Sequence, residues 1–234
     1  MADHHSSHLK ECQSAELEIV QINAQHSRAA TATLSRNINK RQNTIALIQE
    51  PWTVKGQLRG LGQLQGLLFS GRVEKPRTAI FIPKRIKATR LEQFSCVDLT
   101  AVETEILMGG TPMTIIFASC YLPGNAGCLP PTPEMVALTE HCKRKKAHCI
   151  TGCDSNSHHP VWGSSDSSQR GRALVEYLSS TTLQILNKGR EPTFVTSRCQ
   201  TVIDLTLATQ HTAPLMKRKT GMCLEKSPCQ IIGR

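Results

Sequence analysis

The chain alternates short apolar runs with segments of helical periodicity. The runs at 17–23 and 44–50 predict two buried strands, because each is apolar and bounded by polar residues. Between them, residues 27–42 place apolar side chains every four positions, which predicts an amphipathic helix. Four further apolar runs follow before position 124, with turn residues but little helical pattern between them: "LQGLLFSG", "RTAIFIP", "CVDLTAVETEI" and "MTIIFASCYLP". This succession favours antiparallel strands.

The rest of the chain returns to helices alternating with strands. The predicted elements are helices over 133–146 and 170–181, a strand over 148–154, and strands near 183–187 and 201–208. Strand-rich halves separated by helices predict an α+β fold, in which two mostly antiparallel β-sheets pack together with helices outside them, a four-layer α/β sandwich. We expect residues 17–209 to form one domain and residues 1–16 to be a disordered tail.

Composition is that of a globular protein. Of the 234 residues, 39% are hydrophobic and 20% are charged. The longest strongly apolar run, "MTIIFASCYL", is too short to cross a membrane, and the start "MADHHSSHLKECQ" has no apolar secretion signal. We therefore expect an intracellular protein, nuclear or cytoplasmic, with no membrane partner and with its ten cysteines as reduced thiols.

Charge indicates the class of partner. Lysine and arginine number 28 against 18 acidic residues, for a formal net charge of +10. A polyanion, nucleic acid first, is the favoured partner, and a merely soluble basic protein is the alternative. The runs "KRIKATR" (84–90) and "KRKK" (143–146) are candidates for contact with DNA phosphates, with solvated surface as the alternative for both.

Polar side chains end several of the predicted strands. They are Asn23, Glu50, Tyr121, Asp154, Asn156 and Asp204. Because strand ends gather at the rim of a sheet, residues far apart in sequence are expected to converge there. Carboxylate and amide oxygens are ligands that Mg²⁺ prefers. A basic chain with an oxygen-rich rim therefore indicates metal-assisted attack on a phosphodiester.

Six motifs carry a resemblance to a known family. In chain order they are "QIN" (21–23), "IQEPW" (48–52), "SCYLP" (119–123), "GCDSNSHHPVWGSSD" (152–166), "NKGREPTFVTS" (187–197) and "VIDLTLAT" (202–209). With these motifs, residues 17–209 resemble the apurinic-endonuclease-like endonuclease domain of non-LTR retrotransposons, which belongs to the exonuclease–endonuclease–phosphatase superfamily. Within that family, "HHPVWGSSD" and "EPTFVT" are typical of arthropod-type elements.

The resemblance implies a metal site. Glu50 matches the family's metal-binding glutamate. Asn23 matches the asparagine that helps to organise the metal site, and Asp204 matches a late aspartate tied to the metal and to a catalytic histidine. The implied cofactor is Mg²⁺, with Mn²⁺ as a substitute.

The resemblance also implies roles at the scissile phosphate. Tyr121 matches a tyrosine placed near that phosphate, and Asp154 matches the aspartate that takes up or orients the proton of the attacking water. Asn156 matches an amide that helps to hold the phosphate and this aspartate. Family members nick one strand of double-stranded target DNA, and the reverse transcriptase domain of the same polyprotein starts copying from the 3′-hydroxyl.

The end of the chain departs from the family pattern. Superfamily members end with a Ser-Asp-His motif, whose histidine contacts the scissile phosphate, and with a last core strand. Neither is recognisable after residue 209. Codons allowed for Pro228 to Gly233 encode Leu-Ser-Asp-His-Arg in another frame, so we interpret residues 210–234 as a divergent, frame-shifted tail. On this interpretation the last core strand is missing and the copy is defective.

Other interpretations stay open. The chain is either an endonuclease or a catalytically dead remnant that binds DNA, and a phosphatase of the same superfamily is a further alternative. The roles of His158 and His159 are open between phosphate contact and loop packing. A zinc site from Cys142, His148, Cys149 and Cys153 is a further alternative. Because Cys149 and Cys153 lie on one predicted strand without paired C-x₂-C spacing, buried thiols are favoured over a zinc site.

Overall fold

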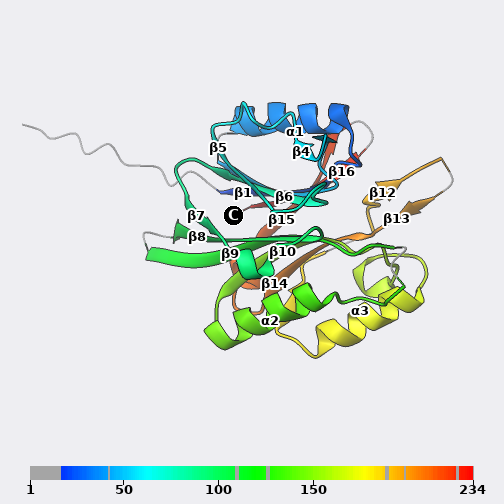
Figure 1. The fold of residues 1–234 in the computed structure, drawn as a ribbon. Helices are drawn as coiled ribbons and strands as arrows, with labels where there is room; N and C mark the ends of the chain where they lie inside the picture. The colour runs from blue at the N-terminus through cyan, green and yellow to red at the C-terminus, as the bar shows by residue number, and fades with distance from the viewer. Residues whose placement is uncertain are drawn as a thin grey trace, which may run out of the picture.

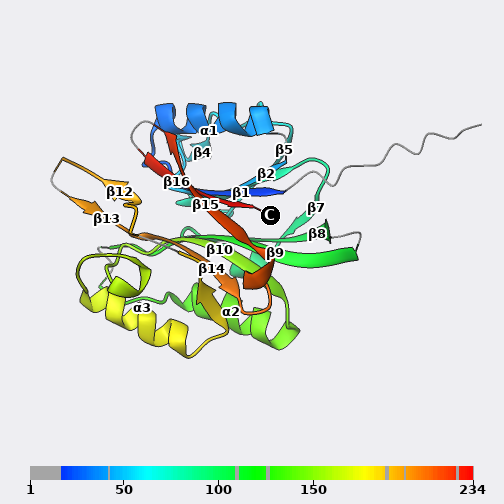
Figure 2. The same ribbon diagram turned by 180° about the vertical axis from the view of Figure 1, so that it is seen from behind.

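Two six-stranded β-sheets pack face to face between helices. The computed structural model describes residues 17–41, 43–108, 111–124, 127–187, 190–197, 199–224 and 227–233, with the backbone alone from 217 onward. Helix α1 (Arg28–Arg41) lies on one outer face, and α2 (Pro133–Lys145) and α3 (Gln169–Ser179) lie on the other (Figure 1). The view from behind shows the same four layers (Figure 2).

The first sheet has the strand order β15-β16-β1-β2-β6-β5. Its strands are β1 (Glu18–Asn23), β2 (Thr44–Gln49), β5 (Gly66–Ser70), β6 (Thr78–Pro83), β15 (Lys217–Leu224) and β16 (Ser227–Gly233). Strands β1 and β2 are parallel because α1 connects them, and the other neighbouring pairs are antiparallel.

The second sheet has the order β11-β14-β10-β9-β8-β7. Its strands are β7 (Lys87–Arg90), β8 (Leu99–Met108), β9 (Thr111–Tyr121), β10 (His148–Asp154), β11 (Leu183–Ile185) and β14 (Asp204–Thr209). Only β9 and β10, which α2 connects, are parallel. Two small hairpins complete the fold, β3 (Thr53–Val54) with β4 (Gln57–Leu58), and β12 (Phe194–Val195) with β13 (Gln200–Thr201).

The central strands are buried on both faces, which is why they are almost continuously apolar. One face of each sheet forms a shared core between the sheets, to which Leu47, Ile80, Phe117 and Ile150 contribute. The opposite faces pack against the helices. Because side chains alternate along a strand, residues two positions apart point into the same layer.

The expected α+β fold of two packed sheets flanked by helices is confirmed. The expectation that the last core strand is missing is wrong. Strand β16 pairs antiparallel with β1, from Glu18 opposite Gly233 to Gln21 opposite Gln230. The physical reason is that strand pairing uses backbone groups, so a segment without the family motif can still cover the outer edge of β1.

Two expectations concern the chain outside the folded layers. The predicted tail over 1–16 lies outside the described residues. Among the helices that the structure describes, none has the length and apolar character needed to cross a membrane.

Candidate active site

Five of the six predicted site residues lie directly at strand ends. Asn23, Tyr121 and Asp154 are the last residues of β1, β9 and β10, and Glu50 follows β2. Asp204 begins β14, which runs antiparallel to β10, and it lies opposite Asp154 in register. The predicted convergence of strand ends therefore places these residues at one rim, where the two sheets face each other.

A hydrogen-bonded pair joins the two sheets at this rim. The amide nitrogen Nδ2 of Asn23 donates to Oδ2 of Asp154 at 2.6 Å. The backbone N–H of Asn156 donates to Oδ1 of the same carboxylate at 3.1 Å. On the other side of Asn23, Oδ1 accepts the backbone N–H of Gln25 at 2.8 Å. Both oxygens of Asp154 are therefore fixed in place by two different elements.

Two of the site residues have a left-handed backbone. Glu50 has φ of 45° and Asn156 has φ of 43°, a region that non-glycine residues seldom occupy. The backbone of Glu50 is held on both sides, since its N–H donates to Arg77 O and its C=O accepts from His26 N, each at 2.8 Å. The His26 ring also lies close, with Nε2 3.7 Å from Oε1 of Glu50. Such strain persists only where the surroundings over-determine it, and it is concentrated at functional sites.

Tyr121 lies between the site carboxylates and the guanidinium of Arg77. Burial first, and then the charges of Glu50 and Asp154 and a hydrogen bond to Glu50, raise the pKa of Tyr121 to about 12 against the opposing charge of Arg77. The Arg77 guanidinium lies over the Tyr121 ring, 4.9 Å from its centroid, and pairs with Asp98. The phenol therefore stays protonated at neutral pH and acts as a hydrogen-bond donor.

The carboxylates at the rim repel one another. Burial, with a smaller contribution from the charge of Glu50, raises the pKa of Asp154 to about 6 against the opposing hydrogen bonds from Asn23 and Asn156. Burial also raises the pKa of Asp204 well above its ordinary value, followed by the charge of Asp154. A divalent cation at this rim would offset the repulsion, and carboxylate and amide oxygens are the ligands that Mg²⁺ prefers. In the chemistry of their donor atoms, the residues present therefore suit such an ion.

The residues come together as linked pairs. Asn23 bonds to Asp154, Glu50 interacts with Tyr121, and Asp154 faces Asp204 across the ladder. Across the described part of the chain, no three acidic, histidine or cysteine side chains form a group that could hold a metal ion. The charges of Glu50 and Asp204 are close enough to influence each other. The protein thus presents an acidic rim at which an ion would have to draw the ligands together.

A buried polar seam, not predicted from the sequence, continues inward from the rim. Gln49 Nε2 donates to Ser119 Oγ at 2.9 Å and to Gly152 O at 3.0 Å. In parallel, Thr206 Oγ1 donates to Gln21 Oε1 at 3.0 Å. Both links cross from one sheet to the other. The sequence does contain a signal for this seam, because each glutamine interrupts an apolar strand close to a site residue. Gln21 lies two positions before Asn23, and Gln49 directly precedes Glu50.

Residues 158–166, which we call the histidine loop, make mainly packing contacts. His159 Nδ1 accepts the backbone N–H of Val161 at 3.2 Å, and its ring lies 5.4 Å from that of Trp162, which is buried. His158 Nδ1 lies 3.1 Å from a carboxylate oxygen of Asp166. The loop-packing alternative therefore accounts for His159 and Trp162, while His158 pairs with an acid.

The cysteines considered for a zinc site lie in the core. Cys142, Cys149 and Cys153 are free thiols buried between the second sheet and its helices. His148 is directed elsewhere, since its Nδ1 lies 2.9 Å from Thr212 Oγ1. These residues are therefore accounted for by packing.

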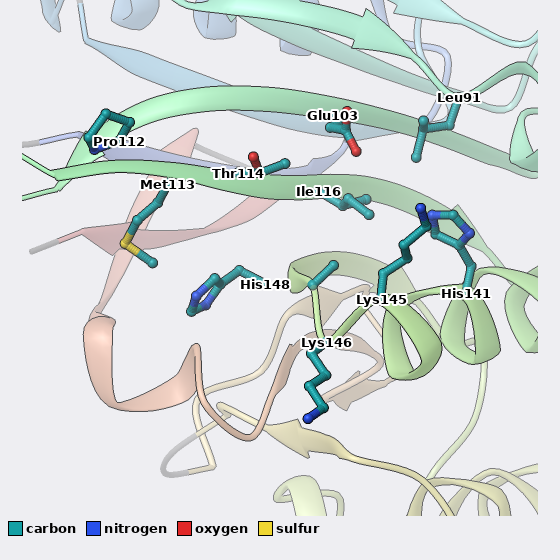
Figure 3. Close-up of a pocket in the computed structure, with 11 residues that line it drawn as sticks. Leu91, Glu103, Pro112, Met113, Thr114, Ile116, His141, Lys145, Lys146 and His148 are labelled. Atoms are coloured by element: carbon teal, nitrogen blue, oxygen red, sulfur yellow. The ribbon is translucent and has the colours of Figure 1, made fainter.

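A separate basic pocket lies far from the rim. Its volume is about 510 Å³, and His141, Lys145, Lys146 and His148 line it together with apolar residues of β9 (Figure 3). His148 begins β10 and Asp154 ends it, so at the rise of a strand the pocket is roughly 20 Å from the rim. The basic run at the end of α2 therefore lies outside the candidate active site.

Comparison with known proteins shows what this chain resembles. The model of a family described as endonuclease-reverse transcriptase matches residues 115–226. The endonuclease domain of TRAS1, a telomere-specific non-LTR retrotransposon, aligns with a TM-score of 0.77 and 23% identity, covering 92% of this chain and 97% of that domain. This chain has the fold of the endonuclease/exonuclease/phosphatase superfamily.

More distant members of the superfamily share the fold. The catalytic domain of Xenopus laevis APE2 aligns with a TM-score of 0.63 and 14% identity, covering 93% of this chain and 90% of that one. The 3′ phosphatase NExo from Neisseria, bound to a product DNA hairpin, aligns with a TM-score of 0.63 and 11% identity, covering 93% and 98%. No curated protein sequence matches significantly. The expected resemblance to retrotransposon endonucleases is confirmed.

Proposed function

We propose that this chain is the metal-dependent endonuclease domain of a non-LTR retrotransposon. It nicks one strand of double-stranded DNA and leaves a 3′-hydroxyl, from which the reverse transcriptase of the parent polyprotein copies. The observation that carries the proposal is the buried Asp154, fixed by Asn23 from the opposite sheet beside Glu50 and Tyr121. The family description, endonuclease-reverse transcriptase, supports the choice of reaction and partner.

Asp154 serves as the proton acceptor. Its pKa of about 6 leaves it ionised at neutral pH, yet close enough to neutrality to take a proton from water. The hydrogen bonds from Asn23 and Asn156 hold both of its oxygens. The attacking water is therefore oriented by a carboxylate that cannot rotate freely.

The remaining residues hold the phosphate and an ion. Glu50 would bind Mg²⁺ or Mn²⁺, with Asp204 and Asn23 completing the site. When bound, the ion supplies positive charge that stabilises the negative charge developing on the phosphate. The protonated phenol of Tyr121 would donate a hydrogen bond to a phosphate oxygen, and the amide of Asn156 would also contact the phosphate.

The tail sets the level of activity. Residues 210–234 lack the Ser-Asp-His motif, so no histidine is supplied at the place where the superfamily has one. Loss of one phosphate-contacting group commonly costs a factor on the order of 10² to 10³ in rate. We therefore propose a weakly active copy with a frame-shifted tail, and a chain with the frame restored should nick faster by about this factor. Genomic codons incompatible with the alternative frame would refute this interpretation.

A nicking assay tests the function. Supercoiled plasmid is incubated with the chain in Mg²⁺, in Mn²⁺ or in EDTA, and open circles are quantified. We expect slow metal-dependent nicking that Asp154→Asn abolishes and that Asp166→Asn, an exposed carboxylate in the histidine loop, leaves unchanged. DNA binding without nicking, even after the frame is restored, would establish the binding remnant instead. Release of phosphate from 3′-phosphorylated DNA without nicking would favour a phosphatase.

A further inference from the structure

Arg170 donates to three backbone carbonyls that flank the site. Its Nε donates to Asn156 O at 3.2 Å, Nη2 to Leu122 O at 3.3 Å, and Nη1 to Cys128 O at 3.3 Å. Leu122 follows Tyr121 directly, so one guanidinium connects the segments that leave β9 and β10. The side chain is half-buried and belongs to the first turn of α3.

The start of α3 is fixed rigidly enough to aim this side chain. Ser168 caps the helix by accepting Gly171 N at 3.0 Å, and its own N–H donates to His158 O at 3.0 Å. Gly171 packs so closely that an added Cβ would lie 1.9 Å from His158 O. The start of α3 therefore packs directly against the loop that follows β10.

We infer that Arg170 is the positioning residue for Asn156. The φ of 43° at Asn156 needs support from its surroundings, and Arg170 holds the carbonyl of this residue while Asp154 holds its N–H. Leu122 O accepts both from Arg170 and from Asn156 Nδ2, at 3.1 Å. The guanidinium thus fixes the acceptor that sets the direction of the Asn156 amide.

Lysine is not equivalent to arginine at this position. The three acceptors come from separate segments and are met by three different nitrogens of one planar fork. An ammonium is a single donor centre on a flexible stem and cannot span them. Arg170→Lys should therefore behave like Arg170→Ala at Asn156, although it keeps the charge.

Amide hydrogen exchange by NMR on the full chain tests the positioning without catalysis. In Arg170→Lys and Arg170→Ala, we expect the backbone N–H of Asn156 to exchange at least about tenfold faster. Amides in the buried turns of α3, at Leu174 and Leu178, report on folding and should keep their protection. Arg172→Ala is the matched control, because Arg172 is exposed on the same turn and its guanidinium donates to Ser167 O, at 3.4 Å, outside the candidate site. Unchanged exchange at Asn156 in a folded Arg170→Lys chain overturns the inference.

Nicking kinetics connect the inference to the proposed function, on which its catalytic part rests. Relative to the unmodified chain, kcat should fall roughly 10- to 100-fold in Arg170→Lys with KM nearly unchanged, because orientation is lost rather than DNA binding. Free guanidinium added to Arg170→Ala should recover part of kcat, which a general loss of stability would not allow. If exchange at Asn156 responds but the unmodified chain does not nick, the positioning stands and the proposed function fails. If kcat falls equally in Arg172→Ala, the assignment to Arg170 is overturned.

Discussion

The ionised carboxylate of Asp154 should destabilise the folded chain at neutral pH. Burial and the charge of Glu50 raise its pKa from an ordinary 3.8 to about 6. The folded chain therefore binds this proton more tightly than the unfolded chain does. The stability it contributes is complete below pH 3.8 and is lost as the pH rises through about 6. Because one pKa unit corresponds to about 1.4 kcal/mol, the loss at neutral pH is about 3 kcal/mol.

Asp154→Asn removes the destabilising charge of the ionised carboxylate, and it loses less stability than this charge costs. The asparagine oxygen can still accept the N–H of Asn156, but its amide nitrogen meets Nδ2 of Asn23, donor against donor. One lost hydrogen bond costs about 1 kcal/mol. The variant should therefore be about 2 kcal/mol more stable than the unmodified chain at pH 7.5 and slightly less stable at pH 4. Relief of the charge that raises the pKa of Asp204 acts in the same direction.

Urea denaturation at several pH values between 4 and 7.5, in EDTA, measures this difference. Thermal unfolding at pH 7.5 should move upward by roughly 4 to 8 °C. Asp166→Asn is the control, since its carboxylate is exposed beside His158, and its effect should stay within about 0.5 kcal/mol at every pH. A stability difference for Asp154→Asn that does not change with pH, or that is larger at pH 4 than at pH 7.5, would refute the argument.

Two further substitutions test the packing around the site, each by urea denaturation. Gly171→Ala should destabilise the chain by about 1–3 kcal/mol, because the new Cβ meets His158 O, and this outweighs the better helix propensity of alanine. Gly62→Ala is the control and should be near neutral, because the space around Gly62 is open. Gln49→Leu should lower the free energy of unfolding by about 2–3 kcal/mol. The reason is that Ser119 Oγ and Gly152 O, both buried, lose the donor that Gln49 supplies. A neutral effect at Gln49 would show that water replaces the lost donor.

Much of the fold could be predicted because the pattern records burial directly. The helix expected over 27–42 is observed as α1, Arg28–Arg41, and the strand expected over 148–154 is β10 at those bounds. Both elements have apolar periodicity imposed by the layers they pack against. The same logic predicted that Asn23 and Asp154 lie at strand ends, because each follows directly on an apolar run.

The sequence could not reveal how those strand ends interact. The left-handed turn at Glu50 and the guanidinium contacts of Arg170 depend on segments far apart in the chain, and neither residue type is distinctive in its local pattern. The pairing of β16 with β1 was missed for the opposite reason. The absence of the side-chain motif predicts a missing strand, although backbone groups alone are sufficient to form the ladder.

The polar seam between the sheets has a consequence for how the domain folds. Gln21 and Gln49 in the first sheet meet Thr206 and Ser119 only when the second sheet packs against the first in one position. A displacement of one sheet along the other by two residues would bury both amides without these hydrogen bonds. Neither sheet alone can hold Asp154 and Asn23 together. Assembly of the candidate site should therefore coincide with the last cooperative step of folding, so that the proposed activity would be absent from partly folded or fragmentary chains.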